Sequence, residues 1–125
     1  HYLSANYALA KMYGYGSPEE LITTLTDITH NLYCDPSKRT EFIRQVQTQG
    51  VVSGFEAEVF RRDGSRLWIS ENAHPVYDAK GALLYYEGTV TDITARKLAQ
   101  TALQVSEEAL AQRERFLTTL VEIQR

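Results

Sequence analysis

The stretch Gly88-Thr89-Val90-Thr91-Asp92-Ile93-Thr94-Ala95-Arg96-Lys97 joins a strand pattern to a helix pattern. Threonine and valine favour extended backbone, and Asp and Thr are residue types that cap helix N-termini. No Gly or Pro follows before Arg125. The spacing therefore predicts one helix over residues 95–125, roughly 47 Å long at 1.5 Å per residue.

The composition places the chain among globular domains. It has 125 residues, a formal net charge of -3 and 43% hydrophobic residues, which is enough for one domain with a single modest core. No run of eighteen apolar residues is present, so we expect no membrane insertion. The mild acidity and the lack of a basic cluster argue against a nucleic-acid partner. Cys34 is the only cysteine, which excludes an internal disulfide and favours a reducing, cytoplasmic setting.

Three start signals predict helices in the first half of the chain. Asn6 is placed to cap a helix that runs to Tyr13, before Gly14. Ser17-Pro18-Glu19-Glu20 combines an N-cap, a proline at the first position and a capping box, and predicts a helix over 18–25. Asp35-Pro36 repeats the device for a helix that extends to Gly50.

After Gly50 the apolar period changes to that of strands. Phe55, Ala57 and Val59 alternate with Glu56, Glu58 and Phe60, and Asp63-Gly64 is a hairpin signal. A second strand is predicted over 67–77, a turn over 78–81, and a third strand over 83–91. Helices followed by an antiparallel meander indicate an α+β fold with the helices on one sheet face.

Four motifs in this order resemble those of PAS domains, the sensory modules of bacterial signalling proteins. They are Asn6-Tyr7-Ala8 with Met12–Leu21, Arg61–Ser65 with Trp68, Pro75–Gly81, and Glu87–Thr94. The resemblance implies a five-stranded antiparallel sheet, cupped by short helices around a small ligand cavity. It assigns residues 1–94 to the PAS domain and residues 95–125 to a signalling linker helix. The usual first strand has no counterpart in these residues, and residues 1–4 are expected to be the tail of a strand.

The sequence lacks the motifs of flavin-adduct and haem-binding members and a strong metal-binding motif, so the identity of any cofactor stays open. Cys34 lies outside the Asn-Cys-Arg-Phe-Leu pattern of flavin-adduct members, and residues 36–50 lack the axial histidine of haem-binding members. His30 and His74 are interpreted as surface or strand histidines. His30, Cys34 and Asp35 form a weak metal signal without a fourth ligand.

A second group of residues along the strands is a candidate for lining a ligand cavity. Aromatic rings and hydrogen-bonding side chains there are the usual lining of small-molecule sites. An ordinary core is the alternative, because the sequence does not determine which strand face turns inward. The candidates are Phe55, Trp68, Ser70, Asn72, Tyr85, Tyr86 and Thr89, with Tyr77 as a further aromatic.

The segment between sheet and helix is expected to relay a signal. In PAS domains, the Asp-Ile-Thr triplet that matches Asp92, Ile93 and Thr94 couples the sheet to the linker, and its aspartate often has a basic partner. Arg96 or Arg66 is placed to be that partner here. The simpler reading is a plain N-cap, and our hypothesis is that the triplet does both.

The predicted long helix carries two competing apolar stripes. One stripe follows a 4-3 spacing and favours a coiled-coil homodimer. The other, Leu103, Leu110 and Leu117, repeats every seven residues, and folding back onto the sheet is the alternative to a dimer. The first stripe consists of Leu98, Ala102, Val105, Ala109, Phe116 and Ile123.

Together with the stripes of the long helix, the resemblance implies a sensory and dimerisation domain without catalysis of its own. A downstream histidine kinase or diguanylate cyclase in the same chain is the expected output, and a small molecule is a possible ligand. A ligand-free dimerising spacer is the alternative. An enzyme would need an acid or base with a shifted pKa in a pocket; the strand candidates are Glu56, Glu58, Glu71, Glu87 and His74.

Overall fold

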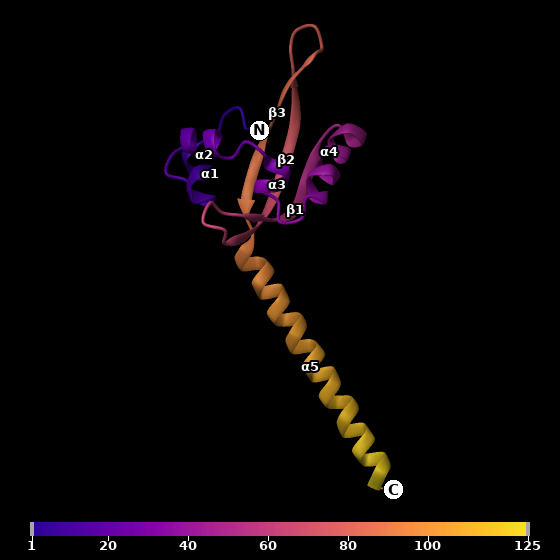
Figure 1. The fold of residues 1–125 in the computed structure, drawn as a ribbon. Helices are drawn as coiled ribbons and strands as arrows, with labels where there is room; N and C mark the ends of the chain where they lie inside the picture. The colour runs from indigo at the N-terminus through magenta and orange to yellow at the C-terminus, as the bar shows by residue number, and fades with distance from the viewer. Residues whose placement is uncertain (1, 125) are drawn as a thin grey trace. The chain divides into compact units, whose positions relative to one another are not determined.

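The computed structural model describes the backbone of residues 2–124 and the side chains up to residue 115. The chain divides into a first unit that ends at Ile93 and a second that begins at Thr94. Helices α1–α4 and strands β1–β3 form the first unit, and helix α5 (Thr94–Gln124) forms the second (Figure 1). The α+β class and the long C-terminal helix predicted from the sequence are confirmed.

The first two helices begin where their caps predict. Asn6 caps α1 (Tyr7–Met12), and its side-chain oxygen accepts a bond of 2.9 Å from the backbone N–H three residues on. Ser17 caps α2 (Pro18–Thr24) in the same way at 3.1 Å. Each bond satisfies an N–H group that the first helical turn leaves unpaired.

The next two helices depart from the prediction. Helix α3 (Ile28–Asn31), capped by Asp27, was not predicted, because four residues are too few to show a helical period. Helix α4 (Ser37–Gln49) begins one residue later than expected, with Pro36 as its N-cap. The Asp35 carboxylate instead accepts from the backbone N–H of residue 37 at 3.0 Å, in a local turn before the helix.

The sheet contains β1 (Val52–Phe60), β2 (Arg66–Tyr77) and β3 (Leu83–Asp92), paired antiparallel in that order. The family resemblance implies five strands, whereas the sheet in the described part of the chain has three. Residues 2–4, expected to be the tail of a strand, are not extended into the sheet there. β1 and β3 are the edge strands of this sheet.

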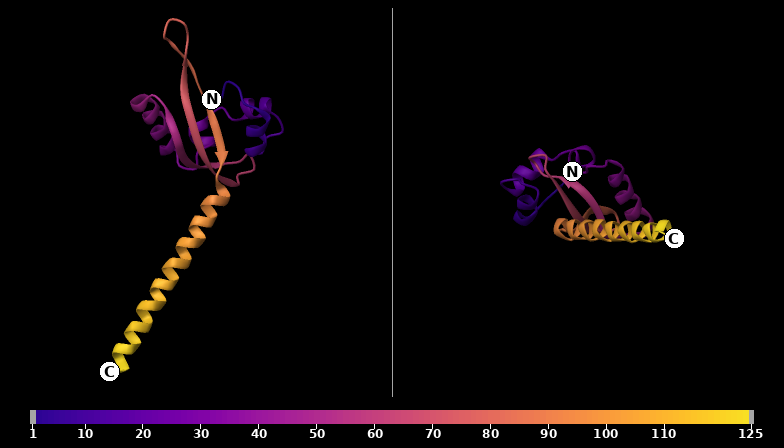
Figure 2. Two further views of the ribbon diagram at one scale, coloured as in Figure 1. Left: turned by 180° about the vertical axis from the view of Figure 1, so that it is seen from behind. Right: turned by 90° about the horizontal axis from the view of Figure 1, so that it is seen from below.

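One sheet face forms the core. Ala57, Val59, Leu67 and Ile69 alternate with more exposed residues and are at most 1% exposed, as a half-buried strand requires. α4 packs on β1. Figures 1 and 2 show α1 and α2 beside one flank of the strands and α4 beside the other. The far end of the β2–β3 hairpin extends past these helices.

Candidate ligand site

A carboxyl group is buried on the helix-covered face of the sheet. Glu71 follows Leu67 and Ile69 on the inward face of β2 and is 8% exposed, the only charged side chain buried among the described residues. It lies opposite Phe55 on β1 and Val90 on β3. A buried carboxyl needs hydrogen-bond partners, so its neighbours decide its state.

Tyr33 supplies one partner. Its hydroxyl donates to Oε1 of Glu71 at 2.7 Å. Tyr33 follows α3 and forms an isolated antiparallel bridge with Val59, which places its backbone beside β1. Burial raises the pKa of Tyr33 well above 10, and the Glu71 carboxylate raises it further, so the phenol remains the donor of this bond.

Tyr13 brings a second hydroxyl to the same region. Tyr13 is 0% exposed. By strict geometry, its hydroxyl has no hydrogen-bond partner among the described residues. Burial raises the pKa of Tyr13, and Tyr2, Glu71 and Tyr33 each raise it further. A weak hydrogen-bond contact with the Tyr2 hydroxyl also raises this pKa, although the contact falls outside strict hydrogen-bond geometry.

Tyr2 and Arg39 complete the group. Tyr2 packs against the core, and burial, with a contribution from Glu71, raises its pKa to about 12. Arg39 on α4 lowers the pKa of Tyr2, Tyr33 and Glu71, so its guanidinium acts on three members. We call Tyr2, Tyr13, Tyr33, Glu71 and Arg39 the tyrosine–carboxyl cluster.

Opposing effects act on the Glu71 carboxyl. Burial raises its pKa above 4.5, while the bond from Tyr33 and the charge of Arg39 lower it, with burial the largest effect. The Arg39 guanidinium carbon lies 5.1 Å from the Phe42 ring centroid. Phe42 meets Phe55 edge to face at 5.6 Å. The cluster thus contains hydroxyl, carboxyl and guanidinium groups near the rings of Phe42 and Phe55.

The cavity residues expected from the sequence do not gather on one face. Phe55 lies inward beside Glu71, whereas Trp68, Ser70 and Asn72 alternate onto the opposite face of β2. On β3, Tyr85 and Thr89 pair with residues of that opposite face, and Tyr86 pairs with Pro75. Tyr85 and Tyr86 are 43% and 47% exposed, and Tyr77 is 57% exposed.

Asn72 has a structural role in holding the strands together. Its Oδ1 accepts from the backbone N–H of Gly54 at 2.8 Å, and its Nδ2 donates to the Thr89 hydroxyl at 3.2 Å. Gly54 has φ +65° and lies at the irregularity of β1 between Val52 and Phe55. One side chain therefore connects all three strands.

A surface hollow lies on the other face of the sheet, around Trp68. This surface pocket of about 310 Å³ is lined by Cys34, Asp35, Lys38, Glu58, Arg66 and Trp68. Arg66 donates to the Glu58 carboxylate at 3.3 Å. Burial, and next the charge of Glu58, raise the pKa of the Cys34 thiol, which disfavours the reactive thiolate.

The histidines considered as metal ligands have acidic neighbours. His30 Nδ1 lies 2.9 Å from Asp27 Oδ2, and His74 Nε2 lies 3.9 Å from Glu87 Oε2. Within the described residues, no group of three or more His, Cys, Asp or Glu side chains is placed to hold a metal ion.

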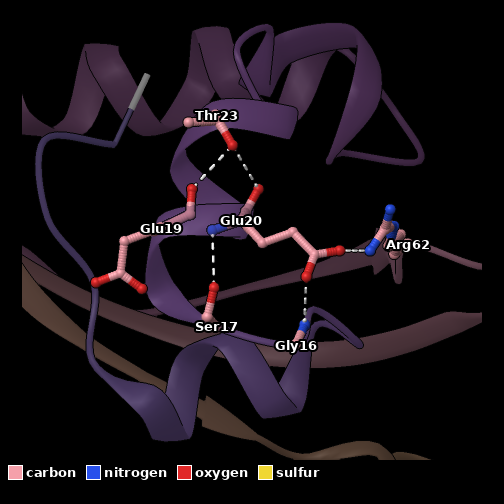
Figure 3. A network of polar contacts seen from close by, with 6 residues as sticks. All are labelled: Gly16, Ser17, Glu19, Glu20, Thr23 and Arg62. Atoms are coloured by element: carbon pink, nitrogen blue, oxygen red, sulfur yellow. Dashed lines mark hydrogen bonds and ion pairs between the residues drawn. The ribbon is translucent and has the colours of Figure 1, made fainter.

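A polar network attaches the β1–β2 hairpin to α2 (Figure 3). The Glu20 carboxylate accepts from the Gly16 backbone N–H at 3.2 Å and forms an ion pair with Arg62. Arg62 also lies over the Tyr15 ring and donates its backbone N–H to the Tyr13 carbonyl at 2.9 Å. The network holds the chain segment that carries Tyr13 in place.

The expected relay segment connects the end of the sheet to the start of α5. Asp92 is the last residue of β3, opposite Ile69, and Thr94 is the first residue of α5. Ile93 between them is 9% exposed and donates its backbone N–H to the Trp68 carbonyl at 2.9 Å. Arg96 lies in the first turn of α5, whereas Arg66 contacts Glu58.

The large apolar side chains described on helix α5 are exposed to solvent. Leu98 and Val105 of the expected dimer stripe are 65% and 60% exposed, and Leu103 and Leu110 of the competing stripe are 61% and 57% exposed. Ala102 and Ala109 are exposed as well. The side chains of Phe116 and Ile123 lie outside the described residues. No helix in the described part of the chain is long and apolar enough to cross a membrane.

The three-stranded sheet and its helical cover define a small α+β module with a polar cluster buried beneath the helices. A family model described as PAS domain matches residues 2–95. The chain belongs to the PAS domain family, as its sequence motifs predicted.

Similar proteins agree with this assignment. A sensory box histidine kinase/response regulator from Burkholderia thailandensis superposes with a TM-score of 0.59 at 26% identity, over 82% of this chain and 76% of that one. A PAS domain from Colwellia psychrerythraea gives 0.56 at 27% identity, over 70% and 72%. The bacterioopsin transcriptional activator of Halobacterium salinarum is 37% identical over 51 residues, which is 41% of this chain and 8% of that protein.

Sequence reasoning missed most of the cluster. Glu71 was considered only as a possible enzyme residue, and Tyr2, Tyr13 and Tyr33 were not selected. A glutamate at an inward position of an otherwise apolar strand was the available signal, together with the high count of eight tyrosines.

Proposed function

We propose that this PAS domain binds a small molecule at the tyrosine–carboxyl cluster and passes the signal through its C-terminal helix. The buried Tyr13 hydroxyl carries the proposal, because no described residue pairs with it in strict hydrogen-bond geometry. Leaving such a group unsatisfied costs about 1–3 kcal/mol. A ligand that pairs with this hydroxyl recovers that energy and stabilises one arrangement of the core.

The proposed relay runs along β2 and β3. Glu71 and Ile69 share the inward face of β2, and Asp92 lies opposite Ile69. Glu71 pairs with Val90, which lies two residues before the end of β3 and four residues before the start of α5. In the proposal, α5 pairs with its copy in a homodimer, and the ligand biases that pair between two packings.

The proposed dimer seam is the stripe that contains Leu98 and Val105. Exposed apolar stripes on a long isolated helix are unfavourable in water, and a second copy is the simplest cover. The proposal includes a cytoplasmic location, supported by the single cysteine.

The proposed output is a histidine kinase or a diguanylate cyclase in the same chain, and the domain itself regulates without catalysing. The kinase is supported by the similar structure from a sensory box histidine kinase/response regulator. The cyclase rests on the family resemblance alone.

The first experiment is native mass spectrometry and absorption spectroscopy of the purified domain. A colourless dimer with extra mass is expected. A dimer of bare mass that no small molecule stabilises would support the ligand-free spacer instead. A flavin or haem band would overturn the interpretation of Cys34 and the histidines.

The relay is tested by Asp92→Ala in the full-length protein. We expect an unchanged melting temperature and loss of the output response, because the sheet no longer acts on α5. Glu87→Ala, at an exposed position of the same strand, is the control and is expected to signal normally. Normal signalling by Asp92→Ala, or its unfolding, would contradict the relay.

A further inference from the structure

The surface pocket around Trp68 combines an aromatic ring with charged side chains. Its volume of about 310 Å³ is within the range of small-molecule sites. Trp68 lines it from β2, on the sheet face opposite the tyrosine–carboxyl cluster, and Cys34 lines it from the segment after α3. We call the six lining residues the Trp68 pocket: Cys34, Asp35, Lys38, Glu58, Arg66 and Trp68.

Both basic side chains of the Trp68 pocket already have acidic partners. Lys38 Nζ lies 3.4 Å from a carboxylate oxygen of Glu41, and Arg66 lies 3.3 Å from Oε1 of Glu58. The Arg66 guanidinium carbon also lies 5.4 Å from the Phe60 ring centroid. An anionic ligand would have to displace these carboxylates, so the two basic groups do not favour an anion.

Asp35 leaves the pocket with an excess of negative charge. Its Oδ1 accepts from the backbone N–H and the hydroxyl of Ser37, at 3.0 Å and 2.8 Å, and among the described residues it forms no ion pair with a basic side chain. Together with Glu41 and Glu58 it makes three carboxylates around two basic groups. The resulting charge favours a positively charged ligand.

We propose that the Trp68 pocket binds a small quaternary ammonium compound. The face of an indole ring attracts organic cations more strongly than the other aromatic side chains do. A primary ammonium group would bring three N–H donors beside Lys38 and Arg66, which themselves only donate. A quaternary ammonium group has no N–H to satisfy, so it enters the pocket without unpaired donors.

Trp68 also connects the pocket to the end of the sheet. Its backbone carbonyl accepts from the Ile93 N–H at 2.9 Å, and Ile93 directly precedes the first residue of α5. A ligand beside Trp68 therefore lies next to the relay segment, on the sheet face opposite Glu71.

Fluorescence of Trp68 tests the proposal, because this residue is the only tryptophan in the chain. Titration of the purified protein with choline at constant ionic strength is expected to saturate, with a Kd in the millimolar range. The uncharged molecule of the same shape, 3,3-dimethyl-1-butanol, is expected to bind about tenfold more weakly, because it lacks the cation–π attraction. Equal affinity for the two, or a choline response that does not saturate, would overturn the proposal.

Alkylation of Cys34 by iodoacetamide locates the ligand, because Cys34 is the only cysteine and is partly exposed. Choline is expected to slow the reaction over the same concentration range that changes the fluorescence. In Trp68→Leu, which removes the aromatic face, choline is expected to leave the alkylation rate unchanged. An alkylation rate that saturating choline does not alter in the wild type would contradict binding in this pocket.

Charge variants give a readout that does not depend on changing Trp68. Glu58→Gln is expected to weaken choline binding about twofold to fivefold, the usual effect of one partly exposed charge. Glu19→Gln, at an exposed position of α2, is the matched control and is expected to bind like the wild type. Equal affinity of Glu58→Gln and Glu19→Gln would overturn the role of the pocket's negative charge.

Glu71→Gln separates this site from the tyrosine–carboxyl cluster. Glu71 lies on the inward face of β2 and does not line the pocket, so this variant is expected to bind choline like the wild type. Loss of choline binding in Glu71→Gln, with a melting temperature like that of the wild type, would place the ligand in the cluster and overturn the assignment to the Trp68 pocket.

Discussion

The Tyr33 hydroxyl donates a hydrogen bond of 2.7 Å to Oε1 of Glu71, 38 residues away in sequence. The bond joins the segment after α3 to the middle strand of the sheet. It satisfies a buried carboxyl in a core that is otherwise mainly apolar. A polar contact of this kind specifies how helices and sheet meet, because a shifted arrangement would leave the carboxyl unpaired.

Tyr33→Phe is expected to destabilise the domain by about 1–3 kcal/mol, because it leaves the Glu71 carboxyl without this donor. Urea unfolding followed by circular dichroism measures the change. Tyr7→Phe is the control, because the Tyr7 side chain is 65% exposed. Equal stability of the two variants would show that the Tyr33 bond contributes nothing.

The contribution of Glu71 to the stability of the wild type is expected to fall as the pH rises above 4.5. The folded state holds the Glu71 proton more tightly than the unfolded chain, since burial raises the folded pKa above that value. The decline ends once the pH exceeds the raised pKa. Glu71→Gln cannot titrate and lacks this component. Parallel pH profiles of wild type and variant, from urea unfolding at several pH values, would exclude a raised pKa at Glu71.

Gly88→Ala is expected to disrupt the pairing of β2 and β3. A Cβ at residue 88 would overlap the backbone carbonyl of Asn72, and rigid backbone cannot move away as a side chain can. We expect a loss of about 3 kcal/mol or more, as for severe overpacking, measured by thermal and urea unfolding.

Gly16→Ala is the matched control for this glycine. Its added Cβ would meet the tip of the flexible Glu20 side chain at 2.8 Å, so a smaller loss is expected. If Gly88→Ala were no less stable than Gly16→Ala, the close approach of β3 to β2 at Gly88 would be contradicted.

Glu20 and Arg62 are expected to couple weakly. Both side chains are partly exposed, at 33% and 49%, and such ion pairs contribute about 0.5 kcal/mol. A double-mutant cycle with Glu20→Gln and Arg62→Met measures the coupling. A coupling of zero would mean that the backbone bond between Arg62 and Tyr13 holds the hairpin by itself.

Val105→Lys is expected to convert the proposed dimer to a monomer, because it places two lysines in the seam. Leu103→Lys, in the competing stripe, is expected to leave the dimer intact. Analytical ultracentrifugation distinguishes the two. The reverse pattern would assign the seam to Leu103 and Leu110.

Local signals in the sequence determined where most elements begin and end. Asn6 and Ser17 cap their helices as predicted, since a cap depends on side chains within three residues of the N–H groups they satisfy. The period-2 pattern located the three strands for the same reason. The four-residue helix α3 carried too little pattern, and the start of α4 moved by one residue because Asp35 forms its own turn.

The sequence by itself thus determined most of the elements, their order and the PAS family, all of which depend on neighbouring residues. Only the tertiary structure decided which strand face is buried, and therefore that Glu71 lies inside while Trp68, Ser70 and Asn72 lie on the other face. A shift of one residue in strand register would exchange these two sets. The meeting of Tyr33 with Glu71, and the burial of the Tyr13 hydroxyl, depend on contacts between distant segments that no local pattern records.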